Sequence, residues 1–416
     1  MKNHLSVVSV FTSLVMLFAA ATAVAAEKYE RPTNRRVSDV LPAKMISGPH
    51  YRIRDPVVSY GYMHHFTVES DFGVFTVTGD GALRKLLKEI QAIAALRKIK
   101  ESKAFVDSVK HSATAPVRFG KHLITNPVDT ITGLPKGVFR IFGNVTTAAT
   151  EKHDPSEDSQ IKQALFVSSW KRDYAHEMGV DVYSSNAVLQ KELNSVGWAA
   201  AIGGLTVSAA TLPASGTAGL VLKQMRTADS VNDALKEEPP ARLRLINEKK
   251  LSAMGTSKDL IKRYLDHPAF TPRHDTIVVT ALARLKYVRG RDAFLESALS
   301  AQDEVAATFY MNIAQTIRGY HETVSPIRQI STMAGLTLAL AKNGWVLIPF
   351  PLDHGVWTER ADRIISHLRA NYRAPGFTGI FELWVTGTLS PLARQQFELR
   401  GIKVVENADK RIEIID

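Results

Sequence analysis

One long segment without a charged residue, Leu193–Leu222, most constrains how this chain can fold. It is long enough to cross a bilayer, since a spanning helix takes about 20 predominantly apolar residues. It is also rich in Ala, Gly, Ser and Thr, and Pro213 interrupts it. We therefore expect two helices, about Asn194–Ala210 and Ala218–Val231, joined by a turn. Small residues let helices approach closely in membranes and in soluble cores alike, so two interpretations stay open: a buried helical hairpin and a membrane-embedded segment.

The N-terminus has the three parts of a secretory signal peptide. Lys2 gives the positive start, Leu5–Ala21 is an apolar run, and small residues fill Ala23–Ala26 before the charged Glu27. This order is typical of a leader that is removed after the small residues. We expect residues 1–26 to be a signal peptide and the chain to be exported to a bacterial periplasm or cell envelope. An uncleaved anchor is the alternative, although the apolar run is short for a span.

The net charge limits the partners that the chain is expected to bind, and the absence of cysteine limits the chemistry that it can carry out. The formal net charge of the chain is +11, and +10 remains without Lys2. For an exported protein this charge favours an anionic membrane surface or an envelope protein as partner, and we expect no nucleic acid. The absence of cysteine excludes disulfides, a thiol nucleophile and thiolate metal sites. No cofactor is expected, and the oligomeric state is not specified by any pattern.

The segment Thr114–Thr147, called the basic strap below, combines helix-start signals with positive charge. Prolines interrupt it, and an 11-residue register keeps one narrow face aligned, because eleven residues are close to three helical turns. Helices of this kind can lie on a membrane surface. The alternative is a broken loop-and-helix segment packed on the body. The side chains that we expect at a membrane surface are Arg118, Lys121, Lys136, Phe139, Arg140 and Phe142.

The clearest β-structure is a hairpin over Val57–Thr78, with its turn at Ser70–Gly73. His64 and His65 are adjacent, so a regular strand points them to opposite faces and they cannot chelate one ion together. We interpret His64, which shares its face with aromatic residues, as a packed histidine, and no metal site is expected. An amphipathic helix should follow over Ala82–Val109.

The second half of the chain changes from helical to α/β patterns. Helical segments with short connections follow one another up to Ile327–Lys342, which is predicted as the last helix of a bundle. Beyond it, strands alternate with helices, which predicts right-handed crossovers and a mostly parallel sheet. The strands are expected at Trp345–Phe350, Gly379–Val385 and Ile402–Val405, and the helices at Thr358–Tyr372 and Ser390–Arg400.

These patterns predict a predominantly helical α+β fold with an N-terminal β-hairpin, a central helical bundle and a small βαβαβ-like C-terminal domain. The expected order is a signal peptide over 1–26, an extended lead-in over 27–56, a hairpin-and-helix domain with the apolar helical hairpin over 57–240, a helical bundle over 241–343, and an α/β domain over 344–416.

Most catalytic signatures are missing from the sequence, which has no HExxH, G-x-S-x-G, Walker A or G-x-G-x-x-G pattern. One constellation follows from topology, because open α/β sheets bind ligands beyond the carboxyl ends of their strands. Asp353 and His354 follow the first C-terminal strand, while Thr386, Thr388 and Ser390 follow the second. We expect Asp353 to orient His354 as a base, and the other three to hold an anionic group at a helix N-terminus. Turn and capping chemistry would account for the same residue types.

Two functions therefore remain. The first is an exported, non-enzymatic envelope protein that associates with a membrane surface or a protein partner. The second is a periplasmic enzyme or small-ligand-binding protein that uses the polar end of the C-terminal α/β sheet. Whether the chain is an enzyme is left open by the sequence.

Overall fold

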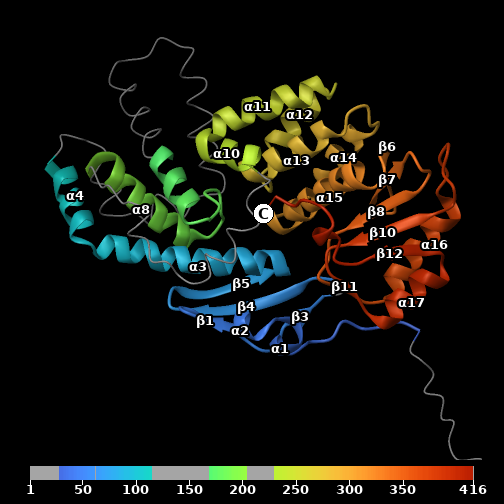
Figure 1. The fold of residues 1–416 in the computed structure, drawn as a ribbon, viewed down its shortest axis with the longest axis horizontal. Helices are drawn as coiled ribbons and strands as arrows, with labels where there is room; N and C mark the ends of the chain where they lie inside the picture. The colour runs from blue at the N-terminus through green and yellow to red at the C-terminus, as the bar shows by residue number, and fades with distance from the viewer. Residues whose placement is uncertain (1–27, 61, 115–167, 204–228, 416) are drawn as a thin grey trace, which may run out of the picture.

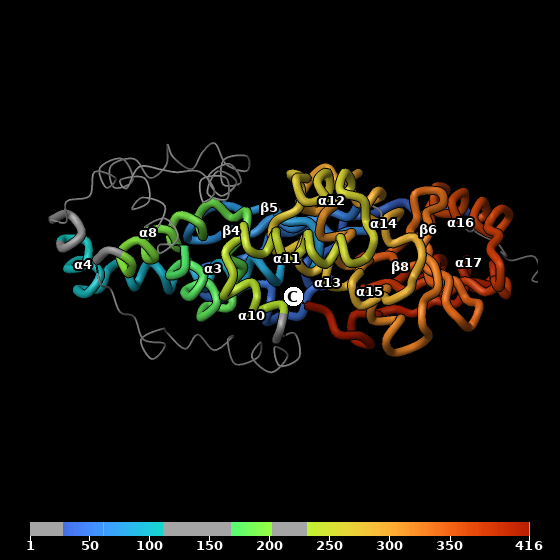
Figure 2. Tube along the Cα trace, turned by 90° about the horizontal axis from the view of Figure 1, so that it is seen from above, coloured from blue at the N-terminus to red at the C-terminus, as the bar shows by residue number. Residues whose placement is uncertain are grey.

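The computed structural model describes residues 28–60, 62–114, 168–203 and 229–415 (Figure 1). The protein is a mixed α+β structure with several small sheets, in which about half of the residues are helical. An N-terminal sheet with long helices occupies one end of an elongated molecule, and a C-terminal sheet with its helices occupies the other (Figures 1 and 2).

The predicted N-terminal hairpin is confirmed over His64–Thr78, whereas Val58–Ser59 of the predicted first strand form a separate strand that folds back and pairs antiparallel with the first strand of the hairpin. Strands β4 (His64–Ser70) and β5 (Gly73–Thr78) pair antiparallel around the expected turn. Alternate residues of β4 are buried, beginning with His64 and continuing with Phe66 and Val68. These side chains pack against helix α3 (Asp80–Glu101).

The lead-in over 27–56 is not an extended segment, which corrects the prediction. It contains two short helices and two strands of the same sheet, while a third short strand lies just beyond it. Ile53 and Val57 join the core under α3 because they share the buried face with the hairpin. The elements are α1 (Val37–Val40), α2 (Ala43–Ile46), β1 (Ser47–Gly48), β2 (Tyr51–Ile53) and β3 (Val58–Ser59).

The predicted helix 82–109 is divided at Ser102 into α3 and α4 (Lys103–Thr114). The Ser102 hydroxyl donates to the carbonyl of Ile99 (2.6 Å) and accepts from the amide of Phe105 (3.2 Å). One side chain thus caps the end of the first helix and the start of the second, since it satisfies backbone groups that neither helix can pair internally.

The first part of the uncharged segment is confirmed as a helix, because Leu193 to Gly203 belong to α8 (Ala187–Gly203). Leu193, Val196 and Ala199 are fully buried and cluster with residues of α3 and α4. The remainder of the segment, 204–222, lies outside the described residues. Among the described helices, none combines the length and the apolar character that a membrane span requires.

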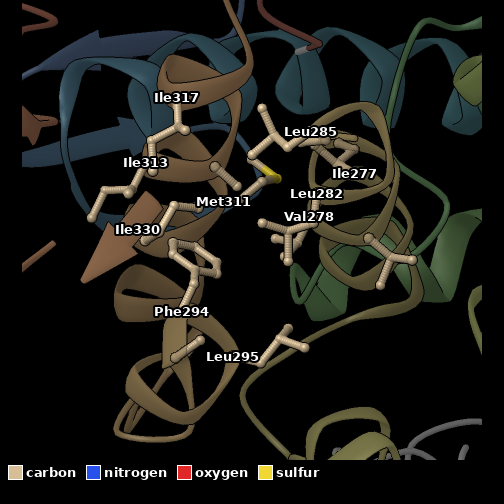
Figure 3. Close-up of a cluster of buried hydrophobic side chains, with 14 of the residues drawn as sticks. Ile277, Val278, Leu282, Leu285, Phe294, Leu295, Met311, Ile313, Ile317 and Ile330 are labelled. Carbon is tan, nitrogen blue, oxygen red and sulfur yellow. The ribbon is translucent and has the colours of Figure 1, made fainter. Parts of the chain in front are cut away.

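The predicted helices between 241 and 323 are confirmed. Their cores meet around Ile277, Phe294 and Met311, which Figure 3 shows together with Ile330 of the C-terminal sheet. Thr271 caps α13, with its hydroxyl 3.4 Å from the amide of His274. These helices are α11 (Pro240–Ala253), α12 (Lys258–Leu265), α13 (Pro272–Arg284), α14 (Arg291–Ala298) and α15 (Glu304–Thr323), and a further helix that was not predicted, α10 (Asp229–Glu237), precedes them.

The segment predicted as a helix over Ile327–Lys342 is a β-hairpin, so that prediction was wrong. Strands β6 (Ile327–Met333) and β7 (Leu336–Ala341) pair antiparallel across Ala334 and Gly335, both of which have positive φ angles of 52° and 78°. Two successive left-handed residues match the tight turns that best suit the twist of a β-hairpin. The α/β region therefore begins near 327, not at 344.

The C-terminal sheet has the order β12-β10-β8-β7-β6 and confirms the parallel βαβαβ pattern. Strand β10 pairs parallel with both β8 and β12, and β7 joins β8 antiparallel. One face packs on helices α16 and α17 and the other on α15 and the bundle, so the sheet is covered on both sides. The elements are β8 (Val346–Phe350), α16 (Glu359–Asn371), β10 (Phe381–Val385), α17 (Pro391–Leu399) and β12 (Ile402–Val405).

Candidate functional site

The structure brings the predicted polar residues to one edge of the C-terminal sheet. Because β8 and β10 are parallel neighbours, their carboxyl ends meet there. The chain then forms a small second parallel pair, β9 (His354–Gly355) with β11 (Thr388–Leu389), in which His354 lies opposite Thr388. We call this edge the rim.

Both predicted rim threonines form hydrogen bonds with other groups of the protein. The Thr386 hydroxyl donates to the carbonyl of Leu352 (2.8 Å) and accepts from its amide (2.9 Å). The Thr388 hydroxyl lies 3.0 Å from Nδ1 of His354. Burial lowers the pKa of His354, and the nearby Arg35 adds to this effect. The imidazole is therefore neutral near pH 7 and is oriented by a threonine.

Carboxylates of the chain itself occupy the helix N-terminus that we predicted as an anion site. The Ser390 hydroxyl caps α17 and donates to Oε2 of Glu30 (2.6 Å). The same Glu30 oxygen accepts the amide of Trp357 (2.6 Å). The amide of Leu389 donates to Oε1 of Glu406 (2.5 Å). A helix N-terminus favours negative charge, and here the lead-in and the C-terminal segment supply it.

Asp353 faces away from His354, so the structure does not contain the predicted pair in which Asp353 orients that histidine. Its Oδ2 accepts the backbone amide of His64 (2.9 Å), and its Oδ1 accepts the backbone amide of Asp80 (3.0 Å). Its own amide donates to the carbonyl of Tyr62 (2.9 Å). One carboxylate thus joins the rim to the start of β4 and to the start of α3.

This contact creates a cluster of three ligand-type side chains, His64, Asp80 and Asp353. Nδ1 of His64 lies 2.9 Å from Oδ1 of Asp80 and 3.9 Å from Oδ2 of Asp353. All three ligand atoms lie within 4.8 Å of one another. The His64 side chain is buried, with 3% of the residue exposed, and its Nε2 has no hydrogen-bond partner.

The Asp353 carboxyl group of this cluster has a pKa outside its usual range. Burial and the nearby charge of Asp80 raise the pKa of Asp353 to about 6, although two backbone amides act in the opposite direction. One imidazole nitrogen with two carboxylate oxygens is a donor set that divalent cations accept. The arrangement can hold such a cation, or it can pass a proton between an aspartate and a histidine.

Sequence reasoning identified Asp353 but not its two neighbours in the cluster. His64 was interpreted as a packed histidine, and its burial agrees with that, yet its polar partners come from the start of α3 and from a loop almost 290 positions away. Asp80 stands between two glycines, a pattern that indicated only a turn. The signal that could have found the cluster is an acidic residue within three positions of the end of a strand, which occurs at both aspartates.

The six side chains proposed for a membrane surface, Arg118 to Phe142, lie outside the described residues. Comparisons of the chain with protein-family models, with curated proteins and with solved structures gave no match.

Proposed function

We propose that this protein is an exported, non-enzymatic component of a bacterial cell envelope that binds an anionic membrane surface through the basic strap and the later part of the uncharged segment, 204–222. The observation that carries the proposal is the packing of the two helices that precede these segments in the chain. Helix α4 ends at Thr114 and α8 ends at Gly203, and these two helices pack side by side at one end of the molecule (Figures 1 and 2).

Helices α4 and α8 pack against each other and against α3 in one hydrophobic cluster. Phe105 and Val109 of α4 belong to the same hydrophobic cluster as Val196 and Ala199 of α8. In addition, the buried carboxylate of Glu192 pairs with Arg97 (3.2 Å) and Lys100 (2.7 Å) of α3. The basic strap and the later part of the uncharged segment, 204–222, therefore follow directly on two helices that share one core, which supports a shared role for them.

Vesicle binding tests this proposal. The mature protein should sediment with phosphatidylglycerol vesicles, and less with phosphatidylcholine vesicles, and binding should weaken as salt is added. Removing the four strap charges in R118Q/K121Q/K136Q/R140Q should weaken binding by up to about a thousandfold, since each basic residue near an anionic surface contributes about 1 kcal/mol.

A charge-matched variant, K44Q/K249Q/K258Q/R360Q, removes four exposed charges from the described surface and controls for net charge. It should bind almost as well as the native chain. Equal losses in the two variants would contradict a role for the strap, and unchanged binding to uncharged vesicles would point to the apolar segment instead.

A second candidate function is divalent-cation binding at the rim, and the His64–Asp80–Asp353 cluster favours it specifically. Titration of the mature protein with Zn²⁺ or Mn²⁺ by calorimetry should show one site. D80N removes one ligand oxygen while keeping the side-chain shape, and should weaken binding at least tenfold, the lower range for loss of even a supporting partner. D71N is the matched control, because Asp71 pairs with His50 (2.7 Å) on an exposed loop. Equal affinity in D80N and the native protein would contradict this function.

A further inference from the structure

A basic pocket lies at the edge of the C-terminal sheet opposite the rim. It is formed where β6 begins and β7 ends. It has a volume of about 530 Å³. Its walls come from the α13–α14 connection, the end of α15, the start of β6 and the end of β7, and α14 and β6 lie side by side in both views (Figures 1 and 2). The lining residues are Lys286, Tyr287, Arg289, His321, Pro326, Ile327, Arg328 and Lys342.

Four of these side chains are permanently positive, and none of the lining residues is acidic. Within the described parts of the chain, no ion pair joins Lys286, Arg289, Arg328 or Lys342 to a carboxylate. Glu322, the acidic residue next to the pocket in sequence, instead pairs with Arg284 (3.1 Å). Four like charges around one concave surface repel one another, and an anion would relieve that repulsion.

Helix ends do not account for so much positive charge. Helices α13 and α15 both end near the pocket, and cations commonly accompany helix C-termini. Each helix terminus is equivalent to about half a negative elementary charge, so the two together offset only about one of the four cations. The helix ends therefore offset only part of the positive charge of the pocket.

Backbone contacts hold the walls of the pocket in place. The amide of Arg289 donates to the carbonyl of Arg328 (3.1 Å), and the amide of Lys342 donates to the carbonyl of Pro326 (2.8 Å). Gly290 permits this docking, because a Cβ there would lie 2.0 Å from the carbonyl oxygen of Ile330. The cations are therefore presented by a preformed scaffold and not by a free loop.

His321 contributes a neutral donor to the same pocket. Its Nδ1 accepts the amide of Ile327 (2.9 Å), which leaves the ring proton on Nε2. Burial lowers the pKa of His321, and Lys342 adds to the lowering against the opposing charge of Glu322. A neutral imidazole with a fixed N–H is suited to donate a hydrogen bond to an oxyanion.

Tyr287 lines this pocket with an exposed ring and a left-handed backbone conformation. Its side chain is 95% exposed and its φ angle is +62°. Left-handed backbone is unfavourable for a bulky residue, and the ring gains no burial in return. Such outliers concentrate at ligand-binding sites, where a bound molecule uses the exposed group.

We propose that this pocket binds the phosphate group of a phosphorylated ligand, with Lys286, Arg328 and Lys342 neutralising the oxyanion and Tyr287 covering a ring next to it. Guanidinium and ammonium groups form charge-assisted hydrogen bonds with phosphate oxygens, which are about twice as strong as neutral ones. The proposal goes beyond membrane binding through the strap, because every residue in it lies in the described C-terminal half.

Calorimetry with the mature protein tests the proposal, with inorganic phosphate and phenyl phosphate as probes. The native protein should bind one phosphate with a Kd below about 1 mM at low ionic strength. K286Q/R328Q/K342Q should weaken binding at least about tenfold, while the matched variant K44Q/K249Q/K258Q should not. K286Q/K342Q, which changes exposed side chains only, keeps the test valid if Arg328 is needed for folding. No saturable binding by the native protein, or equal losses in the matched variant, would overturn the proposal.

Two further measurements identify the kind of ligand. Y287N keeps a residue that tolerates left-handed backbone and should weaken phenyl phosphate severalfold while leaving inorganic phosphate unchanged; equal binding of both probes would overturn the role of Tyr287. Phosphatidylglycerol vesicles distinguish the source of the phosphate. Weaker vesicle binding by K286Q/K342Q would assign a lipid headgroup, whereas an effect on the soluble probes alone would assign a free phosphate ester.

Discussion

His274 should make the stability of this protein depend on pH between about 4 and 6.5. It is buried at the third position of α13, with 4% of the residue exposed. Its Nδ1 accepts the amide of Thr271 (3.2 Å), and its Nε2 lies 3.0 Å from Oγ1 of Thr308. The Thr308 hydroxyl itself donates to the carbonyl of Glu304 (2.8 Å), so it accepts the Nε2 proton. These bonds fit only a neutral imidazole.

Burial is the main cause that lowers the pKa of His274 to about 4; Lys85 and Arg273 also lower it, against Glu304 and Asp181. In the unfolded chain the pKa returns to about 6.5. Because the folded pKa is the lower one, the stabilisation is present above pH 6.5 and is lost as the pH falls towards 4. One pKa unit corresponds to 1.36 kcal/mol, so the loss approaches about 3 kcal/mol and is about 2 kcal/mol by pH 5.

The variant His274→Gln isolates this effect. Glutamine at the third position can still complete the capping box with Thr271, but it does not titrate, and the bond to Thr308 is weakened at every pH. Urea unfolding followed by circular dichroism should show a fall of about 2 kcal/mol between pH 7 and pH 5 that H274Q lacks. H367Q, on the exposed face of α16, is the control. An unchanged pH dependence in H274Q would refute the reasoning.

Three further changes test other parts of the fold by the same urea measurement. Leu96→Ala empties a fully buried position at the base of α4 and α8 and should cost about 2–5 kcal/mol, whereas a loss below about 1 kcal/mol would mean that this core is loosely packed. Gly387→Ala places a Cβ 2.0 Å from the carbonyl oxygen of Asp353 and should destabilise the rim by about 1–3 kcal/mol; a neutral effect would show that the rim backbone moves freely. Ser257→Ala removes the cap of α12 and should cost about 1 kcal/mol, which an unchanged midpoint would contradict.

Local sequence signals were sufficient to predict the elements whose structure depends on residues that are close together in the chain. The β4–β5 hairpin and the alternation of strands and helices after Trp345 were both predicted from short patterns. The hairpin at Ile327–Lys342 was missed because Ile327 and Ile330 repeat at helical spacing. Leu336, Leu338 and Leu340 alternate as in a strand, and the Ala-Gly pair between the two halves is the signal that should have decided for β-structure.

The candidate site could be located from the sequence, but its connections could not. Topology correctly placed Asp353, Thr386 and Thr388 at one edge, because parallel strands end together. Which carboxylate accepts a hydrogen bond from which backbone amide depends on how distant segments of the chain pack together. Glu30 reaches Ser390 across 360 positions, and Asp353 reaches His64 across 289. No local pattern contains such information.

Fractionation of cells that express the full chain tests the central proposal most directly. Membranes are collected at low ionic strength and then washed with high salt and with carbonate. Binding through the basic strap predicts that the mature protein sediments with the membranes and is released by salt, because exposed charges are screened. Retention through both washes would assign the binding to the apolar residues 204–222. A mature protein that remains in the supernatant at low ionic strength would contradict membrane association.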